Sequence, residues 1–310
     1  MEAPKQGKTH ILVYGNDYWY TTDLKLKATV NDAVQVGLAL SKLCQKCNRP
    51  YDVTFVYGDN IVDGKRYFDP IIKEQLEGEE YVIDPDVTRT SLLDHLDALA
   101  SDPEASDNDM VFIYFSGHGS SGLKNKIAPY GGDDEDYDIP FSTLFVVQND
   151  YVETSTTMVR STEITERIES IPGTKIVLSD FCYSGGFVEA GYVSYTPNEY
   201  TGMDAEKMFG LKEEICEKTS TFYLSAARYY EISQEEPAKA YSPTLHGYFT
   251  RALLEALGWD DKTYTLKKGG AYENGMITFF SVARYTWKND HKPQVPMFNG
   301  GSNDIVLFSY

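Results

Sequence analysis

The sequence predicts an α/β fold in which helices cover both faces of a mostly parallel β-sheet. Short apolar runs of strand length alternate with longer segments that repeat apolar residues at helical spacing. The run Met110–Phe115 (MVFIYF) is continuously apolar, which is typical of a strand buried on both faces. Clusters of serine and glycine, such as Ser116–Gly119, follow these runs and end them.

The elements before Met110 alternate between strands and helices. His10–Tyr14 is a short apolar run and predicts a strand, and Val30–Leu43 repeats apolar residues with the period of a helix. Tyr51–Tyr57 (YDVTFVY) is rich in β-branched and aromatic residues, which favours a strand. Thr90–Ala100 has the spacing of an amphipathic helix and is followed by a polar stretch.

The same alternation continues after the loop that follows Phe115. The predicted elements are a helix, two strands, a helix and a strand, in this order: Thr162–Ser170, Lys175–Leu178 (KIVL), Thr221–Ser225 (TFYLS), Phe249–Leu257 and Ile305–Phe308.

A chain of 310 residues can form one large α/β unit or two domains. The segment 191–218 is polar and has no clear period, and predicted strands lie on both sides of it. Neither side completes a sheet. We therefore expect a single domain over residues 1–310, with an exposed linker loop at 191–218 between a larger part, 1–190, and a smaller part, 219–310.

Charge and hydropathy exclude several classes of protein. The chain has 47 Asp and Glu against 28 Lys and Arg, a formal charge of −19. Nucleic-acid binding needs clustered cations, but the longest basic run is the pair Lys267–Lys268. No apolar stretch reaches the roughly 18 residues of a membrane span, and Met1–His10 lacks the apolar core of a signal peptide. We expect a cytoplasmic protein with no nucleic-acid or membrane partner.

The four cysteines are too few for a disulfide scaffold. Cys44 and Cys47 form a C-x-x-C pair, but no second pair follows that would complete a four-ligand zinc site. The pair also lies at the end of a predicted helix, whereas a redox motif lies at a helix start. We expect two ordinary thiols there, and an exposed free thiol at Cys216.

His118 and Cys182 each follow a predicted buried strand. Ligands of open parallel sheets bind at the carboxyl ends of the strands, where loops present side chains. A thiol is a poor nucleophile at neutral pH unless a neighbour such as an imidazole raises its thiolate fraction. Glycines flank both residues and would leave amide N–H groups free to hold an oxyanion. The pattern predicts nucleophilic catalysis by a Cys–His pair.

The segments Ser116–Gly119 (SGHG) and Asp180–Gly185 (DFCYSG) resemble the active-site signature of caspase-type cysteine peptidases, most closely the metacaspases. Further similar segments follow the same order along nearly the whole chain: Asn31–Ala33, Gly247–Leu254 and Pro293–Pro296. The resemblance implies a caspase-like three-layer α/β/α sandwich and a cysteine endopeptidase. It also implies that Cys182 is the nucleophile, that His118 is the general acid and base, and that the N–H groups of Gly119 and Cys182 stabilise the oxyanion.

Three further residues match family positions that line the primary specificity pocket: Asp32, Ser116 and Asp180. Metacaspases hold there the Lys or Arg that precedes the scissile bond, so the resemblance implies protein or peptide substrates of this kind. Carboxylates that converge on a concave site attract a cationic side chain. Caspases that accept Asp use arginines and carry Gln where Asp180 stands, and this sequence has no Arg near either motif.

The sequence departs from the metacaspases in places that bear on cofactor and processing. Tyr183 stands where the family usually has His after the nucleophile. Many metacaspases need calcium; Asp133 and Glu189 are candidate ligands, but Arg160–Thr162 replaces the paired aspartates of the family. We therefore predict no required cofactor, and calcium remains a possible one. Self-cleavage after a basic residue of the long loop has three candidate positions, Lys207, Lys212 and Lys218.

Two alternatives remain at this point. A legumain-like or caspase-like peptidase would have the same fold but would cut after Asn or Asp. A catalytically silent scaffold would keep the fold and bind protein partners without turnover. The intact pair of His118 and Cys182 argues against the scaffold.

Overall fold

The computed structural model describes residues 7–18, 25–58, 61–62, 65–121, 142–145, 157–187, 220–228, 231–237, 242, 244–290, 294–299 and 304–310. Two predictions lie outside these residues: the candidate calcium ligands, Asp133 and Glu189, and the linker segment 191–218 with Lys207, Lys212, Cys216 and Lys218.

A seven-stranded sheet forms the centre of the described structure, in the order β16-β11-β10-β6-β1-β2-β5. Neighbouring strands run parallel, except that β16 lies antiparallel to β11. All seven residues of β6 are buried, as the unbroken apolar run predicts. The strands are β1 (Thr9–Gly15), β2 (Tyr51–Tyr57), β5 (Tyr81–Asp84), β6 (Met110–Ser116), β10 (Thr174–Asp180), β11 (Thr221–Ser225) and β16 (Met297–Asn299).

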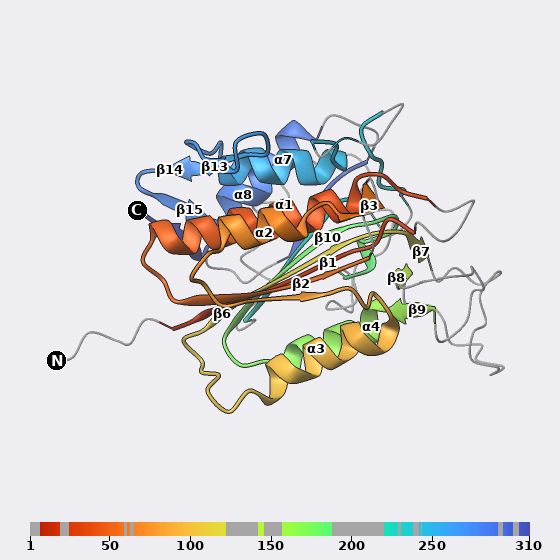
Figure 1. Ribbon diagram of the computed structural model, residues 1–310, viewed down its shortest axis with the longest axis horizontal. Helices are drawn as coiled ribbons and strands as arrows, with labels where there is room; N and C mark the ends of the chain where they lie inside the picture. The colour runs from red at the N-terminus through yellow and green to blue at the C-terminus, as the bar shows by residue number, and fades with distance from the viewer. Residues whose placement is uncertain are drawn as a thin grey trace.

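Helices cover both faces of this sheet (Figure 1). One face carries α1 (Thr29–Lys46), α2 (Asp69–Gln75), α7 (Tyr248–Leu257) and α8 (Phe279–Asn289); the other carries α3 (Arg89–Ser101) and α4 (Ser161–Ser170).

Alternate residues of the strands build two separate cores. In β6, Phe112 and Tyr114 join the core under α1 and α7, whereas Val111, Ile113 and Phe115 join the core under α3 and α4. This is the alternation expected of a strand buried on both faces. The predicted three-layer α/β/α sandwich is confirmed.

Local sequence signals set the helix ends. The side chain of Thr88 accepts a hydrogen bond from the N–H of Ser91 and caps α3. Gly258 ends α7 in the left-handed conformation, with a φ of 81°, and a side chain there would also collide with the backbone of Lys267. Glycine is the residue that fits such a close, left-handed helix end.

The segment predicted as a strand at Ile305–Phe308 is β17 (Val306–Ser309), but it lies outside the central sheet. It pairs antiparallel with β15 (Met276–Thr278), which pairs in turn with β14 (Tyr272–Glu273). The other short strands are β3 (Ile61–Val62), β4 (Lys65–Arg66), β7 (Gly119–Ser121), β8 (Ser142–Phe145), β9 (Met158–Arg160), β12 (Trp259–Asp260) and β13 (Thr265–Leu266).

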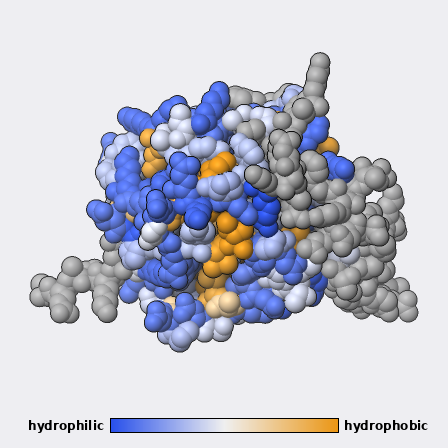
Figure 2. Space-filling view, viewed as in Figure 1, coloured by the Kyte–Doolittle hydropathy of each residue, from blue (hydrophilic) through white to orange (hydrophobic). Residues whose placement is uncertain are grey.

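Cys44 and Cys47 are free thiols at the end of α1, as the sequence predicts. Burial raises the pKa of Cys44 to about 12, so this thiol is unreactive. Within the described residues, no group of three or more His, Cys, Asp or Glu could hold a metal ion, and no helix is long and apolar enough to span a bilayer. Hydrophilic residues dominate the face seen in Figure 2, and one narrow apolar strip crosses its middle.

Candidate active site

The loops that carry His118 and Cys182 start side by side. β6 and β10 are parallel neighbours, and their last residues, Ser116 and Asp180, are partners in register. Each candidate catalytic residue follows its strand by two positions. The N–H of Gly117 donates to the carbonyl oxygen of Asp180 at 3.3 Å and ties the two loops together. The carboxyl ends of the strands therefore form the predicted site.

A cavity of about 340 Å³ opens at this edge of the sheet. Five of the six predicted site residues line it: Asp32, Ser116, His118, Asp180 and Cys182. Its described lining contains no Arg or Lys side chain. The lining residues that the sequence did not single out as site residues are Leu26, Thr29, Gly117, Ser233, Gln234, Glu235 and Gly247.

The sixth predicted residue, Gly119, packs directly against the Cys182 loop. A Cβ atom at this position would collide with the carbonyl oxygen of Cys182 and the ring of Phe181. Only glycine leaves room for the two loops to approach this closely. The Gly119 amide is thereby held next to the cysteine.

The Cys182 thiol is partly buried, and its Sγ lies 3.5 Å from the carbonyl oxygen of Ser233. Burial raises the pKa of this thiol, and the charge of Asp180 raises it further. Backbone hydrogen bonds of Ser233, Cys182 and Gly119 oppose this rise. The two amides that the resemblance implies as oxyanion donors thus both favour a negative charge at the sulfur.

His118 is held through its backbone and its ring. Its N–H donates to the hydroxyl oxygen of Tyr18 at 2.8 Å, and the two ring centroids lie 4.8 Å apart at 42°. Tyr18 is buried and adopts a left-handed backbone with a φ of 54°. The sequence does not single out Tyr18, because nothing distinguishes it among 24 tyrosines.

Asp180 ends β10, and its carboxylate is surrounded by hydrogen-bond donors of Ser233 and Thr250. One carboxylate oxygen accepts from the hydroxyl of Ser233 at 2.6 Å, and the other accepts from the hydroxyl and N–H of Thr250 at 2.6 and 3.2 Å. Only 5% of Asp180 is exposed, and burial raises its pKa. A Cβ atom on Gly247 would collide with this carboxylate, so the start of α7 also needs glycine.

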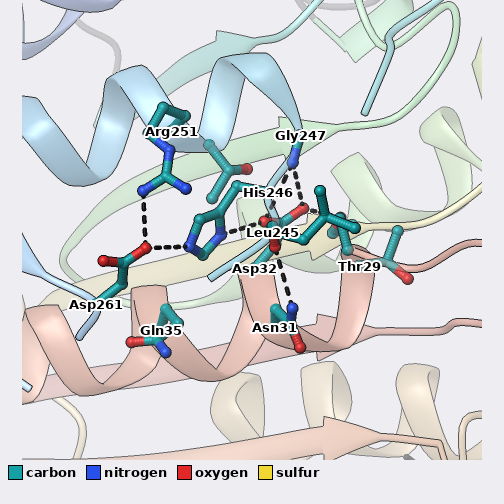
Figure 3. A network of polar contacts seen from close by, with 12 residues as sticks. Thr29, Asn31, Asp32, Gln35, Leu245, His246, Gly247, Arg251 and Asp261 are labelled. Atoms are coloured by element: carbon teal, nitrogen blue, oxygen red, sulfur yellow. Dashed lines mark hydrogen bonds and ion pairs between the residues drawn. The ribbon is translucent and has the colours of Figure 1, made fainter. Parts of the chain in front are cut away.

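Asp32 lies in the first turn of α1 and is 1% exposed. Its Oδ1 lies 2.7 Å from Nδ1 of His246 (Figure 3). Its Oδ2 accepts from the hydroxyl of Ser116 at 3.2 Å. The N–H of Gly247 donates to both oxygens. Burial raises the pKa of Asp32 to about 7, although the hydrogen bond and charge of His246 oppose the rise. Sequence analysis gave His246 no role, although it directly precedes the segment Gly247–Leu254.

A third carboxylate, Glu235, also lines the cavity, and we call its segment, residues 231–237, the rim. It accepts hydrogen bonds from the N–H groups of Ala28 at 2.8 Å and Lys27 at 3.0 Å. These amides lie at the start of α1, where the helix dipole favours a negative charge. Glu235 therefore fixes the rim segment 231–237 to the helix that carries Asp32.

Two more contacts hold the rim in place. The N–H of Gln234 donates to Gln294 at 2.9 Å, and Gln294 donates to Asp290 at 2.9 Å. The N–H of Tyr183, directly after the cysteine, donates to the carbonyl oxygen of Glu231 at 2.7 Å. The rim and the loop that carries Cys182 are thus hydrogen-bonded to each other and form one wall of the cavity. This arrangement can present a thiol, an imidazole and two buried carboxylates to one bound segment of peptide.

Comparison with known proteins agrees with this architecture. A crystallised protein of Geobacter sulfurreducens is similar, with a TM-score of 0.51 and 16% sequence identity, over 95% of this chain and 93% of the other. No protein with a curated description matches the chain. The family model of the caspase domain, peptidase family C14, matches residues 8–284. The chain therefore belongs to the caspase-domain family of cysteine peptidases.

Proposed function

We propose that this protein is a metacaspase-like cysteine endopeptidase that uses Cys182 and His118 to cleave peptide bonds after Lys or Arg. The observation that carries the proposal is the cavity itself. It joins these two residues to the buried carboxylates of Asp32 and Asp180, and its described lining has no cationic side chain.

The chemistry follows from the groups around the sulfur. His118 takes the thiol proton of Cys182 as the sulfur attacks the carbonyl carbon of the scissile bond. The resulting oxyanion accepts hydrogen bonds from the amides of Gly119 and Cys182, and the lowering effect of both backbones on the pKa of the thiol supports this role. The protonated His118 then gives its proton to the leaving amine, and water hydrolyses the thioester with His118 as base.

Because burial raises the pKa of Cys182, its thiolate is not formed in advance at neutral pH. Proton transfer to His118 therefore accompanies attack on the bound substrate.

The preference for Lys or Arg rests on charge. A bound guanidinium or ammonium group would lie near Asp32 and Asp180, and water-excluded pairing of this kind is strong when hydrogen bonds complete it. An Asp side chain in the same place would face these carboxylates without a cation and would be repelled. Glu235 adds a further negative group at the rim.

The test compares the protein with a Cys182→Ala variant on fluorogenic peptides that end in Arg, Lys, Asn or Asp. Each assay is run with calcium and with a chelator. We expect hydrolysis of the Arg and Lys peptides only, and none by the variant. Cleavage after Asn or Asp alone would refute the assignment of the pocket. Absence of cleavage under every condition would favour a scaffold.

We further propose self-cleavage in the segment 191–218 or directly at its end. Mass spectrometry of the incubated protein tests this, with the Cys182→Ala variant as the uncleaved control. Peptides that end at Lys207, Lys212 or Lys218 are expected only in the active protein. The same peptides in the variant would point to a contaminating protease.

A further inference from the structure

A buried histidine lies directly behind the cavity, between two carboxylates. His246 is fully buried. Its Nδ1 lies 2.7 Å from Oδ1 of Asp32, and its Nε2 lies 3.2 Å from Oδ2 of Asp261 (Figure 3). A neutral imidazole has only one N–H to donate, so two carboxylate neighbours call for a second proton.

The chain of charges continues away from the cavity. Arg251 of α7 donates to the same oxygen of Asp261 at 2.8 Å and forms an ion pair with Glu236 at 3.2 Å. The N–H of His246 also donates to Glu236, at 3.2 Å. The charged groups around the imidazole come from three elements and two loops: Asp32 of α1, Asp180 of β10, Arg251 of α7, and Glu236 and Asp261 of the loops before and after α7.

Elimination shows that one proton lies in the inner hydrogen bond, between His246 and Asp32. Burial would raise the pKa of Asp261, but hydrogen bonds from His246 and Arg251 lower it to about 2. Asp261 is therefore ionised at neutral pH, and Nε2 of His246 must donate to it. One more proton then lies between Nδ1 and Asp32, because two bare lone pairs at 2.7 Å would repel each other.

Burial disfavours a charged imidazole, but the hydrogen bonds to Asp261 and Asp32 raise the pKa of His246 nonetheless. With that proton on Nδ1, Asp32 is an ionised carboxylate. Its Oδ2, which accepts from the Ser116 hydroxyl, is then the oxygen that a ligand in the cavity can use.

We propose that His246 is a positioning residue for substrate specificity: as an imidazolium held by Asp261, it keeps Asp32 ionised and oriented to receive the cationic side chain of the substrate. This inference rests on the proposed preference for Lys or Arg. Asp32 alone would be a poorer cation receptor, because burial raises its pKa to about 7 even with the hydrogen bond and charge of His246 opposing the rise.

The proposal fixes the sign of a pH effect. Without the imidazolium, the pKa of Asp32 rises, and this carboxyl group takes up a proton as pH falls. A pocket without His246 should therefore bind cations poorly at pH 6 and recover as pH rises. With His246 in place, the same loss of affinity should begin at a lower pH. If the role of His246 were merely structural, its loss would weaken cation binding equally at low and at high pH.

The experiment uses the Cys182→Ala protein, which keeps the peptide intact, and measures Kd by calorimetry at pH 6.0 and 8.5. The ligands are an Arg peptide and the same peptide with citrulline, its neutral analogue. Adding His246→Asn, which keeps a donor near the position of Nδ1 without a charge, should weaken Arg binding at least tenfold at pH 6.0 and less than threefold at pH 8.5. Citrulline binding should not change. His95→Asn is the matched control, because His95 also pairs with an aspartate, Asp84, on the other face of the sheet.

Equal weakening at both pH values, or none, would overturn the proposal. Because His246→Asn alters a fully buried site, Asp261→Asn provides a second variant, with the same pH-dependent loss expected. A Cys182→Ala protein that binds no Arg peptide at either pH would contradict the proposed specificity itself.

NMR spectroscopy can measure the protonation state of the His246 imidazole without any substrate. In protein labelled with ¹⁵N-histidine, the ring nitrogens of His246 should both be protonated from pH 6 to 8, and Asp32→Asn should return the ring to the neutral form. A wild-type ring that titrates near 6.5, its ordinary value, would overturn the role of His246 even if Arg peptides bind.

Discussion

Replacing Asp180 by Asn separates the charge of the pocket from its structure. The carbonyl oxygen of the asparagine can accept both hydrogen bonds from Thr250. Its amide can donate to the hydroxyl of Ser233, since a hydroxyl also accepts hydrogen bonds. The variant thus keeps every hydrogen-bond partner of Asp180 and loses only the negative charge.

The two effects of this change differ in size and in sign. Removing one partner of a buried ion pair costs about 3 to 5 kcal/mol. Asp32 remains as a second carboxylate, so we take the lower end. About 3 kcal/mol is about 150-fold in kcat/KM, at 1.36 kcal/mol for each factor of ten. Stability should not fall, because the buried charge of Asp180 is itself unfavourable, as its raised pKa indicates.

The assay measures kcat/KM on Arg and Lys peptides together with thermal unfolding at pH 5 and pH 8. A carboxyl group with a raised pKa in the folded state loses its stabilising contribution as pH rises through that pKa. The stability of the Asp180→Asn variant relative to wild type should therefore be higher at pH 8 than at pH 5. Asp97→Asn is the control, since this exposed aspartate pairs with Arg167 on the opposite face. Unchanged turnover of Arg peptides, or unfolding in proportion to the lost activity, would refute the reasoning.

Two further outcomes are expected. Gly119→Ala should lower kcat about 100-fold, similar to the loss of an oxyanion donor, because its Cβ would push the Cys182 carbonyl aside. Gly58→Ala is the control and should retain activity, because its Cβ would make only ordinary van der Waals contacts. His10→Asn should destabilise the fold by about 1 to 2 kcal/mol near pH 5.5 and by less at pH 9 in urea unfolding. The hydrogen bond with Asp52 raises the pKa of His10 above 6.5, so the stability that this histidine contributes is lost as pH rises through its pKa. The pKa of Asp52 lies below 3.8, so the stability that this carboxylate contributes is lost only in acid. Equal destabilisation at both pH values would contradict the second expectation.

The central part of the fold can be predicted because its strands are buried on both sides. Tyr51–Tyr57 and Thr221–Ser225 form strands with the predicted bounds. The edge strands carry a weaker signal. β5 is not fully buried, with Val82 51% exposed, and β16 has only three residues. α8 begins with a capping box in which Ser281 takes the place of the usual Glu or Gln, so the common signature is missing.

The candidate site divides in the same way. Two loops that follow buried parallel strands must meet at one edge of a sheet, so His118 and Cys182 could be paired from the sequence. His246 could not be paired with Asp32, because 214 residues separate them and no period or motif connects α1 with the start of α7. Tyr18 and His118 are likewise 100 residues apart. Contacts of this kind depend on how helices pack over the sheet.

The pocket charge also acts on the nucleophile, and this gives a prediction in the opposite direction to the loss of turnover. Asp180 raises the pKa of the Cys182 thiol, in addition to the effect of burial. Asp180→Asn should therefore lower that pKa and speed alkylation of Cys182 by iodoacetamide at pH 7, while peptide turnover falls. The measurement is the alkylation rate from pH 6 to 10 in both proteins. If alkylation slows together with turnover, the variant has disturbed the site as a whole. If the two readouts move apart, a cationic substrate side chain that neutralises Asp180 would itself favour the thiolate that attacks it.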